Sequence, residues 1–250
     1  MRWTSALCFA FLLAGNATAQ RLVAVDSIMT VRGIVEFRTD GSGSGAWVVF
    51  LPTPVLVRNL KTNIVALAGG ERLAARFIDR YVEVRGRVAV EQDASGRTVA
   101  IANEPRIAEV RPDGLVQEDV DLSLSEHATV ELAVVPRVAA RHDSTGAPSG
   151  VTPTVLFSIV SHSQTELRWF FPTTEVVCVG VQPVDADQGY EIIWKVTGKD
   201  QQVILRMGAV LRQIVAIPDS VARAPGRYVV RASLCGADRL HAEATFDILY

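Results

Sequence analysis

The chain has 250 residues, of which 49% are hydrophobic and 21% are charged. Such a chain can bury a substantial core and lies well away from disordered compositions. Its 25 basic and 27 acidic residues give a formal net charge of -2. This balance excludes a protein built mainly to hold nucleic acid or to spread on an anionic membrane. We therefore expect one large or two ordinary domains and no nucleic-acid partner.

The first residues have the pattern of a cleavable export signal. Arg2 precedes an apolar run at residues 6–14, and the small-residue motif Ala17-Thr18-Ala19 stands just before Gln20. The apolar run is about half as long as the ~20 residues that span a bilayer. The sequence thus predicts a signal peptide at residues 1–19 and a mature chain without a membrane span. That chain is expected in the periplasm or outside the cell.

Two cysteines remain once the signal is removed, because Cys8 lies within it. Cys178 and Cys235 can form a disulfide in an oxidising compartment. Alternation in the predicted strand at residues 227–234 places Cys235 on the face opposite the apolar side chains. A disulfide and two free thiols both remain open at this point.

Residues 27–110 have the element order of a small barrel. Alternating apolar and polar residues predict strands, and one helical pattern follows Gly69-Gly70. The predicted strands are 29–38, 46–51, 55–58, 64–67, 81–90, 97–102 and 106–110, with the helix at 71–80. Three strands, a short helix and two more strands is the order of the OB-fold, a five-stranded barrel. Residues 81–88 resemble the fourth strand of such domains, and residues 31–35 resemble the first.

A connector is predicted at residues 111–126, because acidic residues outnumber Arg111, the one basic residue there. The acidic residues are Asp113, Glu118, Asp119, Asp121 and Glu126. Beyond it, residues 127–250 contain many short alternating segments and no convincing helical period. The expected strands are 129–138, 154–160, 166–171, 175–182, 190–196, 203–207, 212–217, 227–234 and 242–249. This spacing is typical of a β-sandwich.

The second region resembles the bacterial intracellular proteinase inhibitor family of the BsuPI type. The resemblance is carried by the segment at residues 157–172, the turn at residues 185–189 before residues 190–194, and the run Pro225-Gly226-Arg227-Tyr228-Val229-Val230. It implies an immunoglobulin-like sandwich that inhibits a protease. The loop at residues 137–153, rich in Ser, Thr, Gly and Pro from residue 139 on, is then the candidate partner contact. Arg141, His142 and Asp143 are its contact residues, and a simple hairpin connection is the alternative.

No complete catalytic, cofactor or metal signature is found. The four histidines, His127, His142, His162 and His241, lack the close spacing that a shared metal needs. Residues 41–46 have glycines at nucleotide-loop spacing, but they join two antiparallel strands rather than opening a helix. Residues 185–189 are better explained as a tight turn than as a calcium loop.

Four arginines, Arg32, Arg58, Arg85 and Arg87, could line one face of the barrel. Because an exported chain rarely meets nucleic acid, this face does not change the expected partner class. We predict an exported, non-enzymatic two-domain binding protein without a cofactor, whose partner is an envelope or secreted protein. The alternative is an inhibitor of an extracytoplasmic protease that acts through the loop of the sandwich.

Overall fold

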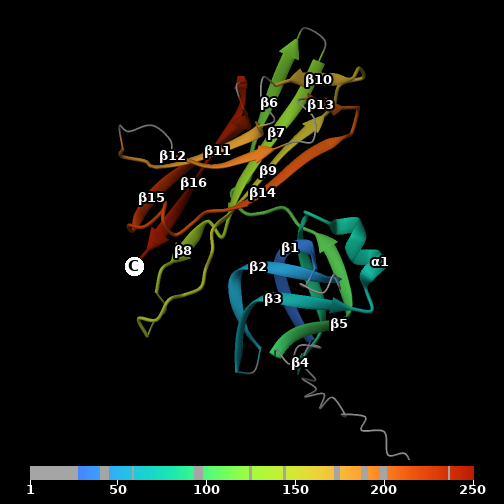
Figure 1. Cartoon of the computed structure of the whole chain (residues 1–250), viewed down its shortest axis with the longest axis vertical. Coiled ribbons are helices and arrows are strands. Elements are labelled where there is room, and N and C mark those ends of the chain that lie inside the picture. Colours follow the sequence, from blue (N-terminus) through green and yellow to red (C-terminus); the bar gives the residue numbers. More distant parts are fainter. Residues whose placement is uncertain are drawn as a thin grey trace, which may run out of the picture.

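The structure, a computed structural model, describes residues 28–39, 45–57, 59–92, 98–123, 126–142, 145–171, 175–186, 191–197, 202–235 and 237–250. The predicted signal peptide, Arg58 and Asp143 lie outside the described residues. Within those ranges the chain forms strands and one short helix, so the mainly β prediction is confirmed (Figure 1). None of the described helical residues makes a helix long and apolar enough to cross a membrane.

Five strands close into a barrel in the order β1-β2-β3-β5-β4, and β4 pairs back to β1. Their bounds are Ile28–Thr39 (β1), Gly45–Val57 (β2), Leu60–Ala68 (β3), Tyr81–Gln92 (β4) and Thr98–Glu109 (β5). β3 and β5 run parallel, while the other neighbours are antiparallel. Val35, Val49, Val65 and Val82 are fully buried inside. The predicted OB-like barrel is therefore present.

The helix between β3 and β4 is shorter than its pattern predicts. It consists of α1 (Glu71–Ala74) and a 3-10 turn (Ala75–Phe77), where the sequence predicts residues 71–80. The amide of Ala74 donates to the carbonyl of Gly70 at 2.8 Å. Asp79 then adopts a positive φ of 56°, which no right-handed helix allows. This reversal ends the helical segment and starts β4.

The remaining strands form two larger sheets and a two-stranded ribbon. One sheet has the order β14-β9-β7-β6, the other has the order β12-β11-β15-β16-β8, and the ribbon pairs β10 with β13. Their bounds are Val116–Ser123 (β6), Glu126–Val135 (β7), Val138–Ala140 (β8), Thr154–Ser161 (β9), Leu167–Phe170 (β10), Glu175–Pro183 (β11), Glu191–Thr197 (β12), Gln202–Leu205 (β13), Val210–Ala216 (β14), Gly226–Leu234 (β15) and Ala237–Leu249 (β16).

The two larger sheets pack face to face around one core. Val130 and Phe157 from the first sheet join Val179, Val230 and Phe246 from the second in a single buried cluster. Alternate residues along each strand supply this cluster, as the period of a strand requires. The arrangement is the β-sandwich that the sequence predicts.

Two details give the sandwich its immunoglobulin-like character. β8 pairs in parallel with the last strand, β16, whereas the neighbouring strands in that sheet are antiparallel. The hydroxyl of Tyr228, near the start of β15, donates to the carbonyl of Ala224 at 2.8 Å. A tyrosine that bonds back to the backbone just upstream is a hallmark of this fold. The ring of Tyr228 also stacks on Phe246 with centroids 5.4 Å apart.

The predicted acidic connector at residues 111–126 is wrong for half of its length, because residues 116–123 form a strand. Residues 116–123 form β6, an edge strand that pairs with β7 along its whole length. Glu118 and Asp119 are exposed, so the segment looks like a solvated linker in sequence. An edge strand tolerates such residues because one of its sides faces solvent.

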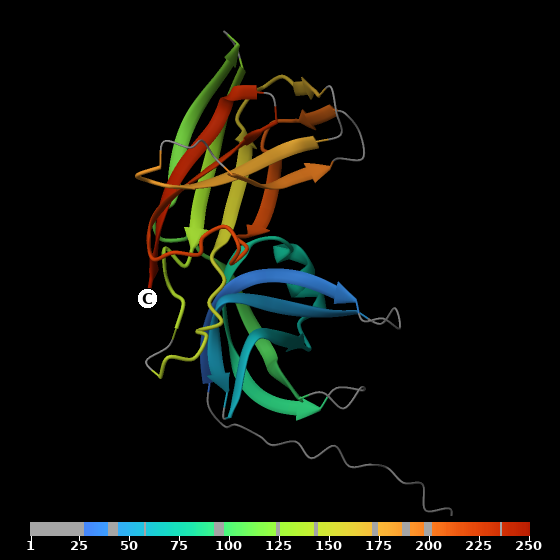
Figure 2. The same cartoon turned by 60° about the vertical axis from the view of Figure 1, so that its left-hand side comes forward.

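The barrel and the sandwich also touch through the segment that leads into β9. The amide of Thr152 donates to the carbonyl of Pro52 at 2.9 Å. The side-chain amide of Asn63 donates to the carbonyls of Leu51 at 2.8 Å and of Gly150 at 3.3 Å. The loop between β8 and β9 therefore runs beside β2 and β3 (Figure 2).

Candidate functional site: an arginine groove on the barrel

The predicted partner loop is held against the rest of the chain. Arg141 forms an ion pair with Asp219, and its side chain is only 17% exposed. His142 and Pro148 form an isolated antiparallel β-bridge, and the hydroxyl of Ser149 donates to the carbonyl of Ala140. Of the three predicted contact residues, Arg141 is held by this ion pair, and Asp143 lies outside the described residues.

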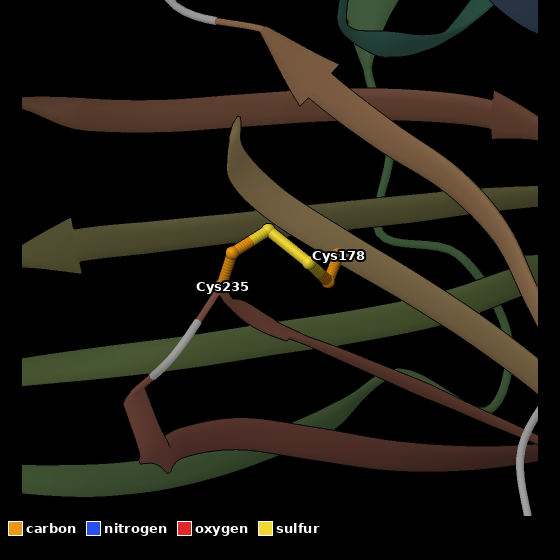
Figure 3. Close-up of a disulfide and its surroundings, with 2 residues drawn as sticks. All are labelled: Cys178 and Cys235. Atoms are coloured by element: carbon orange, nitrogen blue, oxygen red, sulfur yellow. A yellow bond between two sulfur atoms is a disulfide. The ribbon is translucent and has the colours of Figure 1, made fainter. Parts of the chain in front are cut away.

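The two cysteines are joined in the structure (Figure 3). The disulfide links Cys178 in β11 to Cys235 just after β15, with Cα atoms 5.1 Å apart. Cys178 lies opposite Ser233, and both cysteines are half-buried. Their neighbours Val177 and Leu234 are fully buried. The bond therefore lies on the outer face of the sheet, the face that alternation assigned to Cys235.

A hollow in the described surface lies on the outside of the barrel. It has a volume of about 700 Å³ and is formed by β1, the end of β3, β4 and β5. We call it the arginine groove. Its lining residues are Ile28, Ala68, Gly69, Arg85, Gly86, Arg87, Asn103, Glu104 and Arg106.

Strand register places the groove's arginines on one face. Arg85 and Arg87 alternate with the interior residues Val84 and Val88, which are buried. Arg106 lies directly opposite Arg85. Because antiparallel partners share a face, all three guanidinium groups project from the outer side of the barrel.

A bulge in β5 creates this juxtaposition. Arg87 pairs with Asn103 and Arg85 pairs with Arg106. Between these two pairs β5 advances by three residues while β4 advances by two. The extra residue falls between Asn103 and Arg106. Within this segment, Glu104 adopts a positive φ of 47°. That conformation is uncommon for a residue with a side chain. An unbulged register would place Pro105, and not Arg106, opposite Arg85.

Small residues keep the backbones close beneath the groove. A Cβ added at Gly86 would lie 3.1 Å from the carbonyl oxygen of Asn103. Gly70, beside the groove, contacts Pro105 so closely that an added Cβ would lie 2.8 Å from its ring. The bulge is therefore packed into the barrel wall and is not a loose irregularity.

The charges of the groove are not balanced by its surroundings. Within the described residues, Arg85, Arg87 and Arg106 take part in no ion pair, and Glu104 is the one acidic residue in the lining. Glu83, two residues before Arg85 on the same face of β4, is bound to Arg32 at 3.1 Å. Three positive charges and one negative charge leave a surplus of two. Like charges directly opposite each other across strands are unfavourable, so an anion placed between them lowers the energy.

A second hollow, of about 240 Å³, lies where the barrel meets the sandwich. Most of its charges are paired within the wall. Glu109 binds Arg80 and lies 4.0 Å from Arg212, and Glu131 accepts hydrogen bonds from Gln117 and Ser158. This pairing marks the hollow as a junction between the two units.

Two ionisable groups at that junction, Asp79 and Tyr81, have raised pKa values. Burial raises the pKa of the Asp79 carboxyl, the charge of Glu36 raises it further, and Arg212 partly opposes both. Burial also raises the pKa of the Tyr81 hydroxyl. Both shifts follow from packing at the junction.

A hydroxyl and an imidazole meet on the outer face of the sandwich. The hydroxyl of Thr129 lies 2.8 Å from Nε2 of His162 and 3.4 Å from a carboxylate oxygen of Asp119. All three side chains lie at the exposed surface, and none lines either hollow. Among the described residues, no group of three His, Cys, Asp or Glu could hold a metal ion.

The sequence alone predicts part of the groove's lining. Arg85 and Arg87 were expected on one face, and they line it. Arg32 lies beside it in the pair with Glu83, while Arg58 is outside the described residues. Arg106 was missed, because its place depends on the bulge at Glu104. The Glu104-Pro105 pair within a strand was the one available signal.

The chain matches no protein-family model, and no curated protein matches it.

Proposed function

We propose that this protein is an exported, non-enzymatic binding protein whose barrel holds an anionic ligand in the arginine groove. The observation that carries the proposal is the meeting of Arg85 and Arg106 beside Arg87, with none of the three in an ion pair among the described residues. Charge-assisted hydrogen bonds to guanidinium groups are among the strongest polar contacts in proteins. A concave site with a few convergent polar groups is the usual form of a ligand site.

The lining supports binding more than catalysis. It offers guanidinium donors, the side-chain amide of Asn103 and small residues that leave room above the sheet. No nucleophile stands beside a base among the lining residues, which is the arrangement that covalent catalysis requires. Neither Thr129 nor His162 lines the arginine groove.

The disulfide supports export. A bond between Cys178 and Cys235 on the outer face of a sheet persists in an oxidising compartment and is rare in the cytosol. It agrees with the signal pattern at residues 1–19. Export also makes nucleic acid an unsuitable ligand, although the groove is basic.

The inhibitor alternative receives less support. A protease-binding loop presents its key side chain to the cleft of the enzyme, but Arg141 is mostly buried and bound to Asp219. Presentation would first break that ion pair. We therefore propose no second function.

A groove-filling variant tests the proposal. Ala68→Trp fills the groove without changing its charge, and Ala216→Trp, on an exposed position of the sandwich, is the matched control. Each mature protein is incubated with host envelope extract, repurified and examined by native mass spectrometry. We expect a bound small molecule in the wild type and the control, and none in Ala68→Trp. A wild type that captures nothing, or an Ala68→Trp variant that keeps the ligand, contradicts the proposal.

A further inference from the structure

We infer that the ligand of the arginine groove presents two neighbouring phosphoryl groups, as a diphosphate does. This inference rests on the proposed function and names the chemistry of the ligand. Arg85 and Arg106 lie opposite each other, and Arg87 lies next to this pair. The pair matches one phosphoryl group, and Arg87 matches the second.

Spacing supports two adjacent anionic groups. Directly opposed residues on antiparallel strands have Cβ atoms about 4.5–5.5 Å apart, so Arg85 and Arg106 can bind one group together. Arg87 follows Arg85 by two residues on the same face, which is a rise of roughly 6.6 Å along the strand. Long arginine side chains bridge that step, and a second group bonded to the first then lies within reach of Arg87.

Charge supports phosphoryl groups over a single carboxylate. The lining has a surplus of two positive charges, which one carboxylate would leave partly uncompensated. A phosphoryl group offers three acceptor oxygens and matches the planar guanidinium fork in a bidentate manner. Two linked phosphoryl groups therefore fit the number of guanidinium donors that three arginines offer.

The strained bulge supports a built site. The positive φ of Glu104 is unfavourable for a residue with a side chain, and it is retained in a well-packed wall. Its consequence is the placement of Arg106 opposite Arg85, which itself adds like-charge repulsion. The backbone strain at Glu104 and the repulsion between Arg85 and Arg106 are both unfavourable when no anion is bound. A bound anion explains both features, because it offsets the repulsion that the bulge creates.

The test is calorimetric titration of the mature chain with inorganic pyrophosphate. We expect one pyrophosphate per chain, with weaker binding of inorganic phosphate and of the tricarboxylate citrate. Arg85→Ala and Arg106→Ala should each weaken pyrophosphate binding about tenfold to a hundredfold, because each removes a charge-assisted contact. Arg223→Ala, which removes an exposed arginine from the sandwich, is the matched control and should bind as the wild type does.

Thermal unfolding separates a lost contact from a lost fold. Without ligand, the two groove variants should unfold no earlier than the wild type, because each relieves a like-charge contact. Pyrophosphate should raise the unfolding temperature of the wild type and of Arg223→Ala, and not that of the groove variants. Equal affinity of wild type and groove variants, or tighter binding of citrate than of pyrophosphate, would overturn the inference.

A soluble diphosphate and a lipid diphosphate headgroup present the same chemistry. Cosedimentation with phosphatidylcholine vesicles that contain a prenyl diphosphate distinguishes them. Vesicle binding that free pyrophosphate displaces supports the lipid source, and binding of free pyrophosphate alone supports the soluble source. If pyrophosphate fails to bind while Ala68→Trp still loses the captured envelope ligand, the phosphoryl inference is wrong and the proposed binding function stands.

Discussion

Cys178 and Cys235 join β11 to the end of β15 on the outer face of the sandwich, and the bond closes a segment with a sequence separation of 57. The buried neighbours Val177 and Leu234 face the other way, into the core. Because the bond contributes no core packing, its effect on stability comes mainly from restricting the unfolded chain.

Removal of this bond tests that account. The double variant Cys178→Ser and Cys235→Ser should lose about 4 kcal/mol of unfolding free energy in the loop-entropy description. Urea denaturation, compared with the wild type in the presence and absence of reductant, measures the loss. A reduced wild type should match the variant, and a loss below about 1 kcal/mol would contradict the account.

Tyr228→Phe tests the corner between β14 and β15. The substitution keeps the ring on Phe246 and removes the hydroxyl that bonds to the carbonyl of Ala224. We expect a loss of about 1 kcal/mol, the usual contribution of a neutral hydrogen bond. Tyr250→Phe is the control, since Tyr250 is 89% exposed. Equal denaturation midpoints for Tyr228→Phe and the wild type would be the opposing result.

Asp79→Asn tests the junction. Because burial raises the pKa of Asp79, the folded state holds its proton more tightly than the unfolded chain. Its ionised form therefore opposes folding at neutral pH, and the cost disappears below the ordinary value of 3.8. Asparagine also tolerates the positive φ at this position.

The Asn variant should thus be more stable than the wild type at neutral pH, and its advantage should shrink as the pH falls toward 3.8. Unfolding free energies measured across this range check the trend. Asp185→Asn, an exposed change in the sandwich, controls for the loss of one charge. An advantage that grows with acidification would have the wrong sign.

Export predicts a defined start of the mature protein. Intact mass of protein recovered from the expressing host should correspond to a chain that begins at Gln20. Ala19→Arg places a large charged residue at the cleavage motif and should leave the uncleaved chain attached to the membrane fraction. A full-length, soluble wild type would exclude the signal peptide.

Local alternation was enough to predict most of the architecture. The barrel strands are regular, and Val82, Val84 and Val88 mark the interior of β4 without any knowledge of its neighbours. The two strands predicted at residues 46–51 and 55–58 merge into β2, where the register shifts between Phe50 and Val55. Pro52 and Pro54 interrupt the pattern there, because proline cannot donate to the ladder.

Non-local pairing explains what the sequence did not reveal. β6 has too little apolar alternation to be recognised, and only its pairing with β7 makes it a strand. The arginine groove was incomplete for the same reason, since Arg106 meets Arg85 only after the bulge at Glu104 shifts the register. A single strand read in isolation does not reveal how many residues its partner uses for the same distance.

The acidic rim of the sandwich has a consequence for how molecules of this protein meet. Glu118 and Asp119 are exposed on β6, the outermost strand of its sheet. Two copies approaching rim to rim would bring these carboxylates together, so their repulsion hinders growth of a continuous intermolecular sheet.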